Sequence, residues 1–415
     1  MDKVKLLKTS EIFDSYEKRF ARARAEKPFS INKTENERME ILTKVKKMLG
    51  YDDSLVPTVH ALETVSSLDM GNFSVDELRY QTWDDVYSSA SLYLPKREGK
   101  LPLVFLMCGH GDYGRLNKGY SLMATRLALM GFAVIVPDNI GQGDREFMGH
   151  WHSIGPFYSG LTLQGLIAME SVALIRYMTA DSRFDKTRFA AIGNSGGGTL
   201  TLMLSALCPE ISVLSSSGYP SEFHYILSKE RPHCSCNLLR GCAFLEMWEI
   251  YSLFAPKPML LEQGLFDNLI AVEYFERNKR KLEAVYALMD AEDNFEAKNP
   301  HTKHPWDKED REIISDFLVR RLGVCAVDIV NEEMLVSDDL PSERCVTMPK
   351  EAIDTDTLCE KLSGRKMPED TLLSDIFKPV FGGAEIEESE IIADLGRGSV
   401  MRVLSQMECA LTKLE

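Results

Sequence analysis

Residues 189–200, FAAIGNSGGGTL, place one serine among four glycines directly after an apolar run. Residues 193–197 match the pattern G-x-S-x-G, in which a nucleophilic serine sits at the tip of a turn from a strand into a helix. Such a turn strains the serine backbone, so the residues two before and two after it must be small. The N-terminus of the following helix directs backbone N–H groups at a developing oxyanion. The stretch predicts Ser195 as a nucleophile and the Gly196 amide as an oxyanion donor.

Other chemistry is possible for a glycine-rich turn of this kind. A dinucleotide-binding turn needs G-x-G-x-x-G and an acid at the end of the following strand, and neither is present. A phosphate-binding loop needs Gly-Lys-Ser/Thr, which does not follow. An ordinary turn with Ser195 as a helix cap remains open, since the pattern is short. The buried strand predicted before it and the apolar helix predicted after it favour a nucleophile.

A nucleophilic serine needs a base, and the base needs an acid that orients it. In the hydrolase order the acid follows the serine at the end of a strand, and the histidine comes last. Asp267 lies just beyond the strand predicted in KPMLLEQG. Asp293 and Glu262 are alternative acids, but Glu262 lies inside that strand, so we expect it to face the sheet packing or to hydrogen-bond elsewhere.

Two histidines, His301 and His304, lie in the polar stretch NPHTKHPWDKED before a predicted helix. We prefer His304 as the base because it lies three residues before the expected helix start at Asp307, where it can be held rigidly. A solvated loop histidine is the alternative for either residue.

The second oxyanion donor in this arrangement comes from the loop after an early strand. CGHGDYG at 108–114 occupies that place, and we assign the donor to the amide of His110. The His110 imidazole either lines the site or bonds a neighbouring loop. The expected substrate pocket is lined by Gly109, Trp151, His152 and Asn194.

The composition is that of a soluble globular protein, with 44% hydrophobic and 27% charged residues. A net charge of −15 argues against nucleic acid and anionic membrane partners. There is no apolar stretch of the roughly 20 residues that span a bilayer, and MDKVKLLKTSEIF lacks a signal-peptide core. Nine scattered cysteines fit reduced thiols. We therefore expect a cytoplasmic protein that acts on a small molecule.

The stretch PHCSCNLLRGC contains His233, Cys234, Cys236 and Cys242, so it could instead be a metal site. A zinc site of this kind is usually formed by one C-x-x-C pair and a second pair at a distance, whereas this stretch has a single C-x-C and no second pair. We predict no metal and no cofactor, and place this stretch in a loop over the pocket.

Strands and helices alternate from residue 101 onward. This alternation predicts an α/β fold with a mostly parallel sheet covered by helices on both faces. The expected strands are LPLVFLMCG, FAVIVPD, TRFAAIG, ISVLSSSG and KPMLLEQG, and the expected helices are YSLMATRLALMG, LTLQGLIAMESVALIRYMTA, GTLTLMLSALCP, AVEYFERNKRKLEAVYALM and KEDREIISDFLVRRLG.

Three regions are expected along the chain. Residues 1–74 are predicted to form a helical N-terminal extension that acts as a cap or an oligomer contact, with a helix over 35–49. Residues 75–324 form the catalytic domain, which begins with a meander of strands. Residues 325–415 are an acidic C-terminal appendage of unknown role. A homo-oligomer is compatible with this organisation.

Residues 75–323 resemble the α/β-hydrolase superfamily, and within it the dienelactone-hydrolase and acetylxylan-esterase-like group. The resemblance lies in CGHG, PDNIGQGDRE, GNSGGGTLTLMLSALCPEI, EMWEIYSLFAPKPMLLEQGLFDN and KHPW. It implies a serine esterase with the triad Ser195, Asp267 and His304. Cys108 stands where relatives often carry histidine, and FDNLI replaces a proline-containing turn after the acid.

These features predict a serine hydrolase that cleaves small acyl esters, acetyl esters of carbohydrates among them, through an acyl-enzyme. A thioesterase, a peptidase of the prolyl-oligopeptidase type and an inactive binding protein with this fold are the alternatives. The peptidase would need a long propeller before the catalytic domain, and only about 100 residues precede the oxyanion strand.

Overall fold

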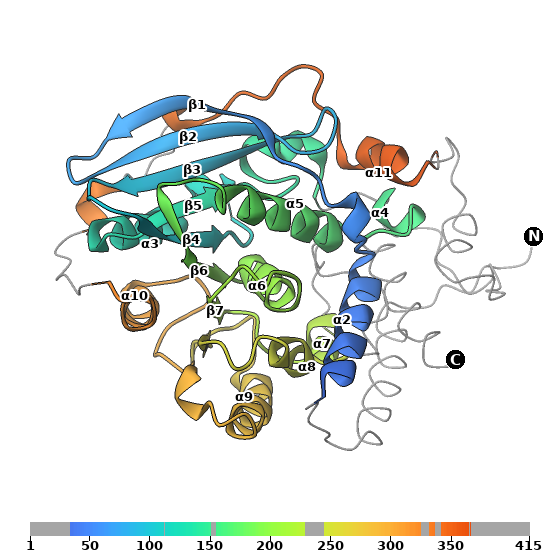
Figure 1. The fold of residues 1–415 in the computed structure, drawn as a ribbon, viewed down its shortest axis with the longest axis vertical. Coiled ribbons are helices and arrows are strands. Elements are labelled where there is room, and N and C mark those ends of the chain that lie inside the picture. Colours follow the sequence, from blue (N-terminus) through green and yellow to red (C-terminus); the bar gives the residue numbers. More distant parts are fainter. Residues whose placement is uncertain are drawn as a thin grey trace, which may run out of the picture.

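The computed structural model describes residues 34–111, 113–150, 155–228, 245–324, 332–336, 342–364 and 366. Within this part of the chain, nine strands form one sheet in the order β1-β2-β3-β5-β4-β6-β7-β8-β9 (Figure 1). Pairing is antiparallel from β1 to β5 and parallel from β5 to β9. The strands are β1 (His60–Asp69), β2 (Phe73–Gln81), β3 (Tyr87–Pro95), β4 (Leu101–Met107), β5 (Ala133–Pro137), β6 (Phe184–Asn194), β7 (Val213–Ser217), β8 (Met259–Glu262) and β9 (Phe295–Lys298).

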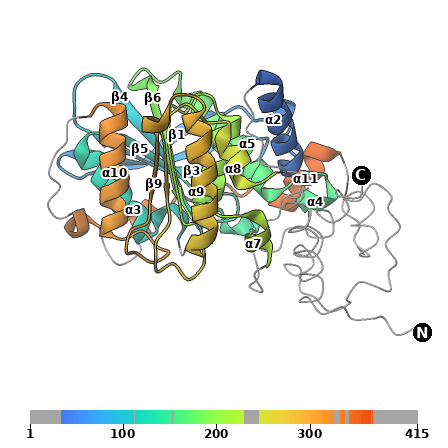
Figure 2. The ribbon, with the colours of Figure 1, turned by 90° about the horizontal axis from the view of Figure 1, so that it is seen from below.

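Helices cover both faces of this sheet. One face packs against α3 and α10, and the other packs against α5, α6, α8 and α9, with α2 lying outside α5, α6 and α8 (Figure 2). The α-helices of the described chain are α2 (Glu35–Leu49), α3 (Lys118–Met130), α4 (Gly155–Tyr158), α5 (Leu163–Met178), α6 (Gly196–Leu207), α7 (Phe223–Ser228), α8 (Met247–Ser252), α9 (Val272–Ala287), α10 (Lys308–Leu322) and α11 (Thr355–Ser363).

Strand β4 lies at the centre of the sheet and is buried along its whole length. Because successive side chains of a strand point to opposite faces, Val104 and Leu106 join the cluster under α3 and α10. Leu103 and Phe105 join the larger cluster under α5 and α6. The predicted α/β fold with a mostly parallel, doubly covered sheet is confirmed.

The structure differs from the predicted helical extension over residues 1–74. Helix α2 spans residues 35–49 as expected, with a capping box between Thr34 and Glu37. Residues 60–69, however, form β1, an edge strand of the main sheet. Most of β1 is exposed on both faces, so its sequence lacks the apolar alternation that marks a half-buried strand.

Part of the region after residue 324 packs against the sheet. The Arg79 guanidinium on β2 donates to the carbonyl of Thr347 at 2.8 Å, and the Ile353 amide donates to the carbonyl of Asp85 at 3.0 Å. Residues 342–347 therefore lie against the antiparallel end of the sheet. The division into three regions remains a prediction.

No helix among the described residues combines the length and the hydrophobicity that a bilayer crossing requires.

The docking of α2 gives a testable difference between two methionines of one helix. Met48 is fully buried and Met39 is 51% exposed. We expect Met48→Ala to lower the free energy of unfolding by about 2–5 kcal/mol, because it leaves a cavity in the core. Met39→Ala, the matched control, should change it by less than about 0.5 kcal/mol. Urea unfolding measures both, and equal effects would show that α2 does not dock as described.

Candidate active site

Ser195 occupies the turn between β6 and α6, at the carboxyl end of the central strands. Its backbone has φ 59° and ψ −119°, a conformation that is strained for a residue with a side chain. The flanking glycines make this turn possible. A Cβ on Gly193 would collide with the carbonyl of Gly197, and a Cβ on Gly197 would collide with the carbonyl of Met107. Both glycines of the sequence pattern are therefore sterically required.

Helix α6 begins at Gly196, so its first amides and its dipole are directed at the space above Ser195. The loop after β4 lies beside this helix end: a Cβ on Gly196 would lie 3.1–3.2 Å from Cε1 and Nδ1 of His110. The Gly109 amide donates to the Tyr120 hydroxyl at 2.6 Å. Since Gly109 is engaged elsewhere, the amides of Gly196 and His110 are the candidates for an oxyanion hole.

His304 and Asp267 form a hydrogen-bonded pair, with His304 Nδ1 2.8 Å from Asp267 Oδ2. Burial opposes the ionised form of Asp267, but hydrogen bonds from His304, Gln263 and the Leu269 amide outweigh it and hold the pKa of its carboxyl below the ordinary value. An ionised Asp267 fixes the proton of His304 on Nδ1. The opposite nitrogen, Nε2, is buried and has no hydrogen-bond partner among the described residues.

The loop that carries His304 is attached directly to the turn of Ser195. The Asn194 side chain donates to the carbonyl of His304 at 3.0 Å, and the Trp306 indole donates to the Ser217 hydroxyl at 2.6 Å. The Ser195 amide in turn donates to the carbonyl of Ser217 at 3.0 Å. A Cβ on Gly218 would lie 3.2 Å from Cε1 of His304. The backbone of Ser195 and the imidazole of His304 therefore lie against the neighbouring residues 217 and 218.

The alternative acids and base of the sequence lie in other environments. His301 is exposed and packs against Phe266, with 6.0 Å between ring centroids. Asp293 is exposed in a short 3₁₀ turn. Glu262 is fully buried, and burial followed by nearby carboxylates raises the pKa of its carboxyl well above the ordinary value. Glu262 thus faces the sheet packing, as its position in a strand predicts.

The His110 imidazole contacts a second histidine, His150, with 2.9 Å between the two Nε2 atoms. His150 Nδ1 lies 2.7 Å from the carbonyl of Ile140, which can only accept, so Nδ1 carries a proton. In neutral His150 the Nε2 atom is then an acceptor, and both His110 and Gln142 are placed to donate to it. This pair fixes the orientation of the His110 ring.

The four expected pocket residues have different outcomes. Gly109 lies against Ser195, since a Cβ there would lie 2.9 Å from Cβ of Ser195. Asn194 is buried and bonded to His304, so it positions the histidine loop instead of facing a pocket. Trp151 and His152 lie outside the described residues, as does the stretch 233–242. Cys108 is a buried core residue, and burial raises the pKa of its thiol.

Two residues of the site were not assigned from the sequence: Gln263 donates to Asp267 Oδ2 at 2.8 Å, and the Tyr120 hydroxyl accepts from the Gly109 amide. His150, which the sequence groups with Trp151 and His152 as an expected pocket wall, contacts His110. Only Gln263 could have been suspected from the sequence, because it directly follows the end of a predicted strand and lies four residues before Asp267. The described residues contain no cluster of three or more His, Cys, Asp or Glu side chains that could hold a metal ion.

Comparisons with known proteins agree with this fold. The model of a family described as acetyl xylan esterase (AXE1) matches residues 57–232. A Bacillus subtilis protein named "Putative hydrolase YtaP" is 27% identical over 214 residues, covering 48% of this chain and 72% of that protein. Among solved structures, Methylesterase BT1017 aligns with a TM-score of 0.59 and 19% identity, covering 84% of this chain and 78% of the other. A glucuronoyl esterase from Solibacter usitatus aligns with a TM-score of 0.56 and 15% identity over 72% and 95%.

The turn at Ser195 predicts a difference between two glycines in the first turns of helices. We expect Gly197→Ala to lower the free energy of unfolding by more than about 2 kcal/mol, because its methyl group meets the Met107 carbonyl. Gly119→Ala in α3 is the control, since a Cβ there meets only the Asn117 side chain at 3.4 Å. It should be neutral or stabilising by up to about 1 kcal/mol. Chemical denaturation measures both, and a neutral Gly197→Ala contradicts the close approach.

Proposed function

We propose that this chain, a carboxylic ester hydrolase of the acetyl-xylan-esterase-like group in the α/β-hydrolase superfamily, cleaves small acyl esters through Ser195, His304 and Asp267. Acetyl esters of carbohydrates are the proposed substrate class. The observation that carries the triad is the buried Nε2 of His304, which lies opposite the Asp267 bond and has no hydrogen-bond partner among the described residues. Its imidazole lies against residue 218, beside the residue to which the Ser195 amide donates.

The proposed reaction begins with proton transfer from the Ser195 hydroxyl to His304 Nε2 as the serine oxygen attacks the ester carbonyl. The amides of Gly196 and His110 hold the oxyanion of the tetrahedral intermediate. The carbonyl re-forms, the C–O bond to the alcohol breaks, and the alcohol leaves with the proton from His304. Water then attacks the acyl-enzyme by the same route, and Asp267 keeps His304 in the required tautomer throughout.

The substrate class rests on the family match and stays open to test. The names of the structural relatives point to sugar esters of two kinds: acetyl groups on a sugar hydroxyl, and esters of a uronic acid carboxyl. Both are hydrolysed by the same triad, so the shape of the pocket decides between them. A thioester is cleaved by the same steps, and a hydrolase-fold binding protein would bind without turnover.

The nucleophile is tested with a substrate panel. Acetylated xylo-oligosaccharides, a uronate methyl ester, p-nitrophenyl acetate and acetyl-CoA are compared, with fluorophosphonate labelling of the protein. Ser195→Ala should lose turnover by at least about 10³-fold and lose all labelling, since no other group forms the acyl-enzyme. Ser212→Ala, one residue before β7, is the folded control. Labelling that persists in Ser195→Ala would refute the nucleophile, and acetyl-CoA as the best substrate would replace the esterase with a thioesterase.

The base is tested by the pair of histidines in one loop. His304→Ala should lower kcat by at least about 10³-fold, because the serine loses its proton acceptor. His301→Ala should leave kcat within about threefold, since its ring is exposed and has no contact with Asp267 among the described residues. Steady-state kinetics on p-nitrophenyl acetate measure both. A larger loss in His301→Ala than in His304→Ala would reverse the assignment.

A further inference from the structure

We propose that Arg344 is a positioning residue for the ester hydrolysis, supplied by the 342–347 segment from outside the predicted catalytic domain. It balances a group of carboxylates that fixes the oxyanion loop, which we define as the described residues 108–111 and 113–116. The inference rests on the proposed function, because the loop is argued to carry an oxyanion donor.

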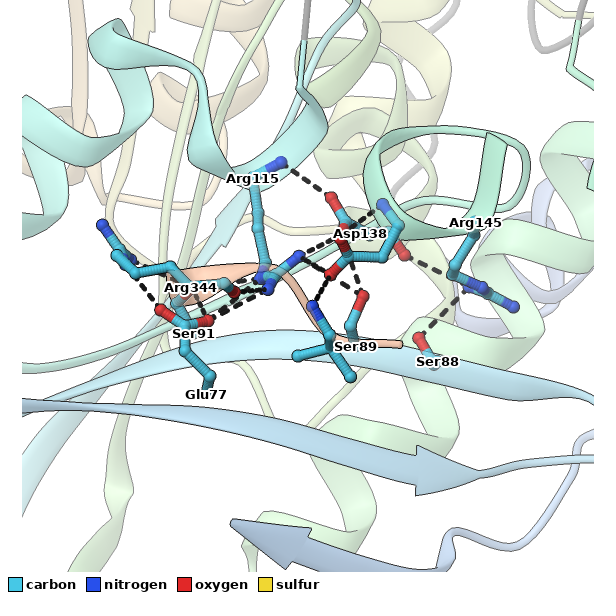
Figure 3. Close-up of polar contacts among 10 residues, drawn as sticks. Glu77, Ser88, Ser89, Ser91, Arg115, Asp138, Arg145 and Arg344 are labelled. Carbon is cyan, nitrogen blue, oxygen red and sulfur yellow. Dashed lines mark hydrogen bonds and ion pairs between the residues drawn. The ribbon is translucent and has the colours of Figure 1, made fainter. Parts of the chain in front are cut away.

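Arg344 reaches into the interior of the antiparallel end of the sheet. Its Nε donates to Glu77 Oε1 at 2.6 Å, and its Nη2 donates to the Ser91 hydroxyl at 3.1 Å and the Tyr93 hydroxyl at 2.9 Å. Glu77 is fully buried on β2. Burial disfavours the charged guanidinium, but Tyr93 and Glu77 outweigh it and raise the pKa of Arg344. Figure 3 shows Arg344 and Arg115 on opposite sides of Glu77 and Ser91.

Arg115 shares Glu77 with Arg344 and belongs to the oxyanion loop. It is fully buried, and its guanidinium pairs with Glu77, Asp138 and Asp144. Its Nη2 also donates to the carbonyl of Arg344 at 2.8 Å. The two arginines are therefore linked both through a common carboxylate and directly through the backbone of the 342–347 segment.

Asp138 fixes the backbone of the oxyanion loop in a second way. The Arg115 amide donates to Asp138 Oδ1 at 2.7 Å. The two preceding residues, Tyr113 and Gly114, have φ values of 69° and 54°, and a Cβ on Gly114 would collide with Asp138. The turn that reverses the loop after His110 thus depends on the position of the Asp138 carboxylate.

Charge balance explains why Arg344 matters to this arrangement. Glu77, Asp138 and Asp144 carry three negative charges, and Arg115 and Arg344 carry two positive charges. The neighbouring Arg145–Glu170 pair, which also contacts the carbonyl of Asp138, adds no net charge. Without Arg344, one guanidinium would face three carboxylates, of which Glu77 and Asp138 are fully buried. An unpaired buried carboxylate is strongly destabilising, so Glu77 would draw Arg115 toward itself or the loop would open to water.

The 342–347 segment is held here by polar contacts. A cavity of about 150 Å³ lies beside Arg344, between the segment, β2, β3 and α3. The Val346 amide donates to Asp144 Oδ2 at 3.0 Å, next to the Arg344–Glu77 pair. Besides the buried Val346 side chain, these charged contacts join the segment directly to the carboxylates that hold the loop.

The test compares Arg344→Met with the wild type on p-nitrophenyl acetate and by the rate of fluorophosphonate labelling. A displaced oxyanion donor weakens only the transition state, so we expect kcat to fall at least about tenfold while KM changes less than about threefold. The double variant Glu77→Gln with Arg344→Met has the same net charge as the wild-type cluster, and should recover most of the lost kcat. Thermal unfolding establishes that each variant is folded at the assay temperature.

Arg79→Met is the matched control, because Arg79 anchors the same segment through the Thr347 carbonyl without touching the buried carboxylates. We expect its kcat to stay within about twofold of the wild type. An equal loss in Arg79→Met and Arg344→Met would overturn the charge argument in favour of simple anchoring. A folded Arg344→Met with wild-type kcat would overturn the inference outright.

Two further outcomes are decisive. If Arg344→Met does not fold, the comparison passes to Arg344→Lys, which keeps the charge but not the fork of donors. An intermediate kcat at unchanged KM then supports positioning, and a wild-type kcat refutes it. If the wild type shows neither turnover nor labelling that depends on Ser195, the proposed function fails and the inference fails with it. If the wild type is active and the Arg344 variant has the same kcat, the inference about Arg344 is wrong while the proposed function stands.

Discussion

At φ 59° and ψ −119°, the backbone of Ser195 is in a region that costs a non-glycine residue of order 1–3 kcal/mol, so the surrounding packing must compensate. The compensation comes from the neighbouring strands. Gly197 lies against the carbonyl of Met107 at the end of β4, and Gly198 lies against that of Ser217 at the end of β7. The turn is therefore held between the two strands that flank β6. Those strands, and not the turn residues alone, keep the hydroxyl at the carboxyl edge of the sheet.

The remaining members of the site are held by the same edge. Asn194 ends β6 and bonds the histidine loop, Ser217 ends β7 and bonds Trp306, and Gln263 follows β8 and bonds Asp267. Since β6, β7 and β8 are adjacent and parallel, three short contacts bring together residues that are far apart in the sequence. This agrees with the general rule that sites of open α/β sheets form beyond the carboxyl ends of their strands. The strand order therefore brings the Ser195 turn, the His304 loop and Asp267 to one edge of the sheet.

Much of this could be predicted from the sequence because periodicity and turn chemistry are local signals. The alternation of apolar runs after residue 101 predicted the parallel sheet, and the glycines around Ser195 predicted the strained turn. Edge strand β1 could not be predicted, because it is largely exposed and takes its conformation from pairing with β2. The direction of the Asn194 side chain could not be predicted either. Its position beside Ser195 in the sequence suggested a pocket residue, and only the tertiary structure shows that it donates to the carbonyl of His304.

Arg344 illustrates a further limit of reading domains from composition. After Gly323 the sequence becomes acidic and its apolar periodicity weakens. In such a stretch no local sequence feature distinguishes an arginine that packs against the protein interior from an arginine in solvent. Its burial follows from Glu77, which lies on an inward position of β2 and leaves a negative charge that Arg115 alone does not balance. A folding unit must satisfy the charges it buries as well as its apolar surface. Residues 342–347 thus pack with the sheet that carries Ser195, although the sequence pattern ends about 20 residues earlier.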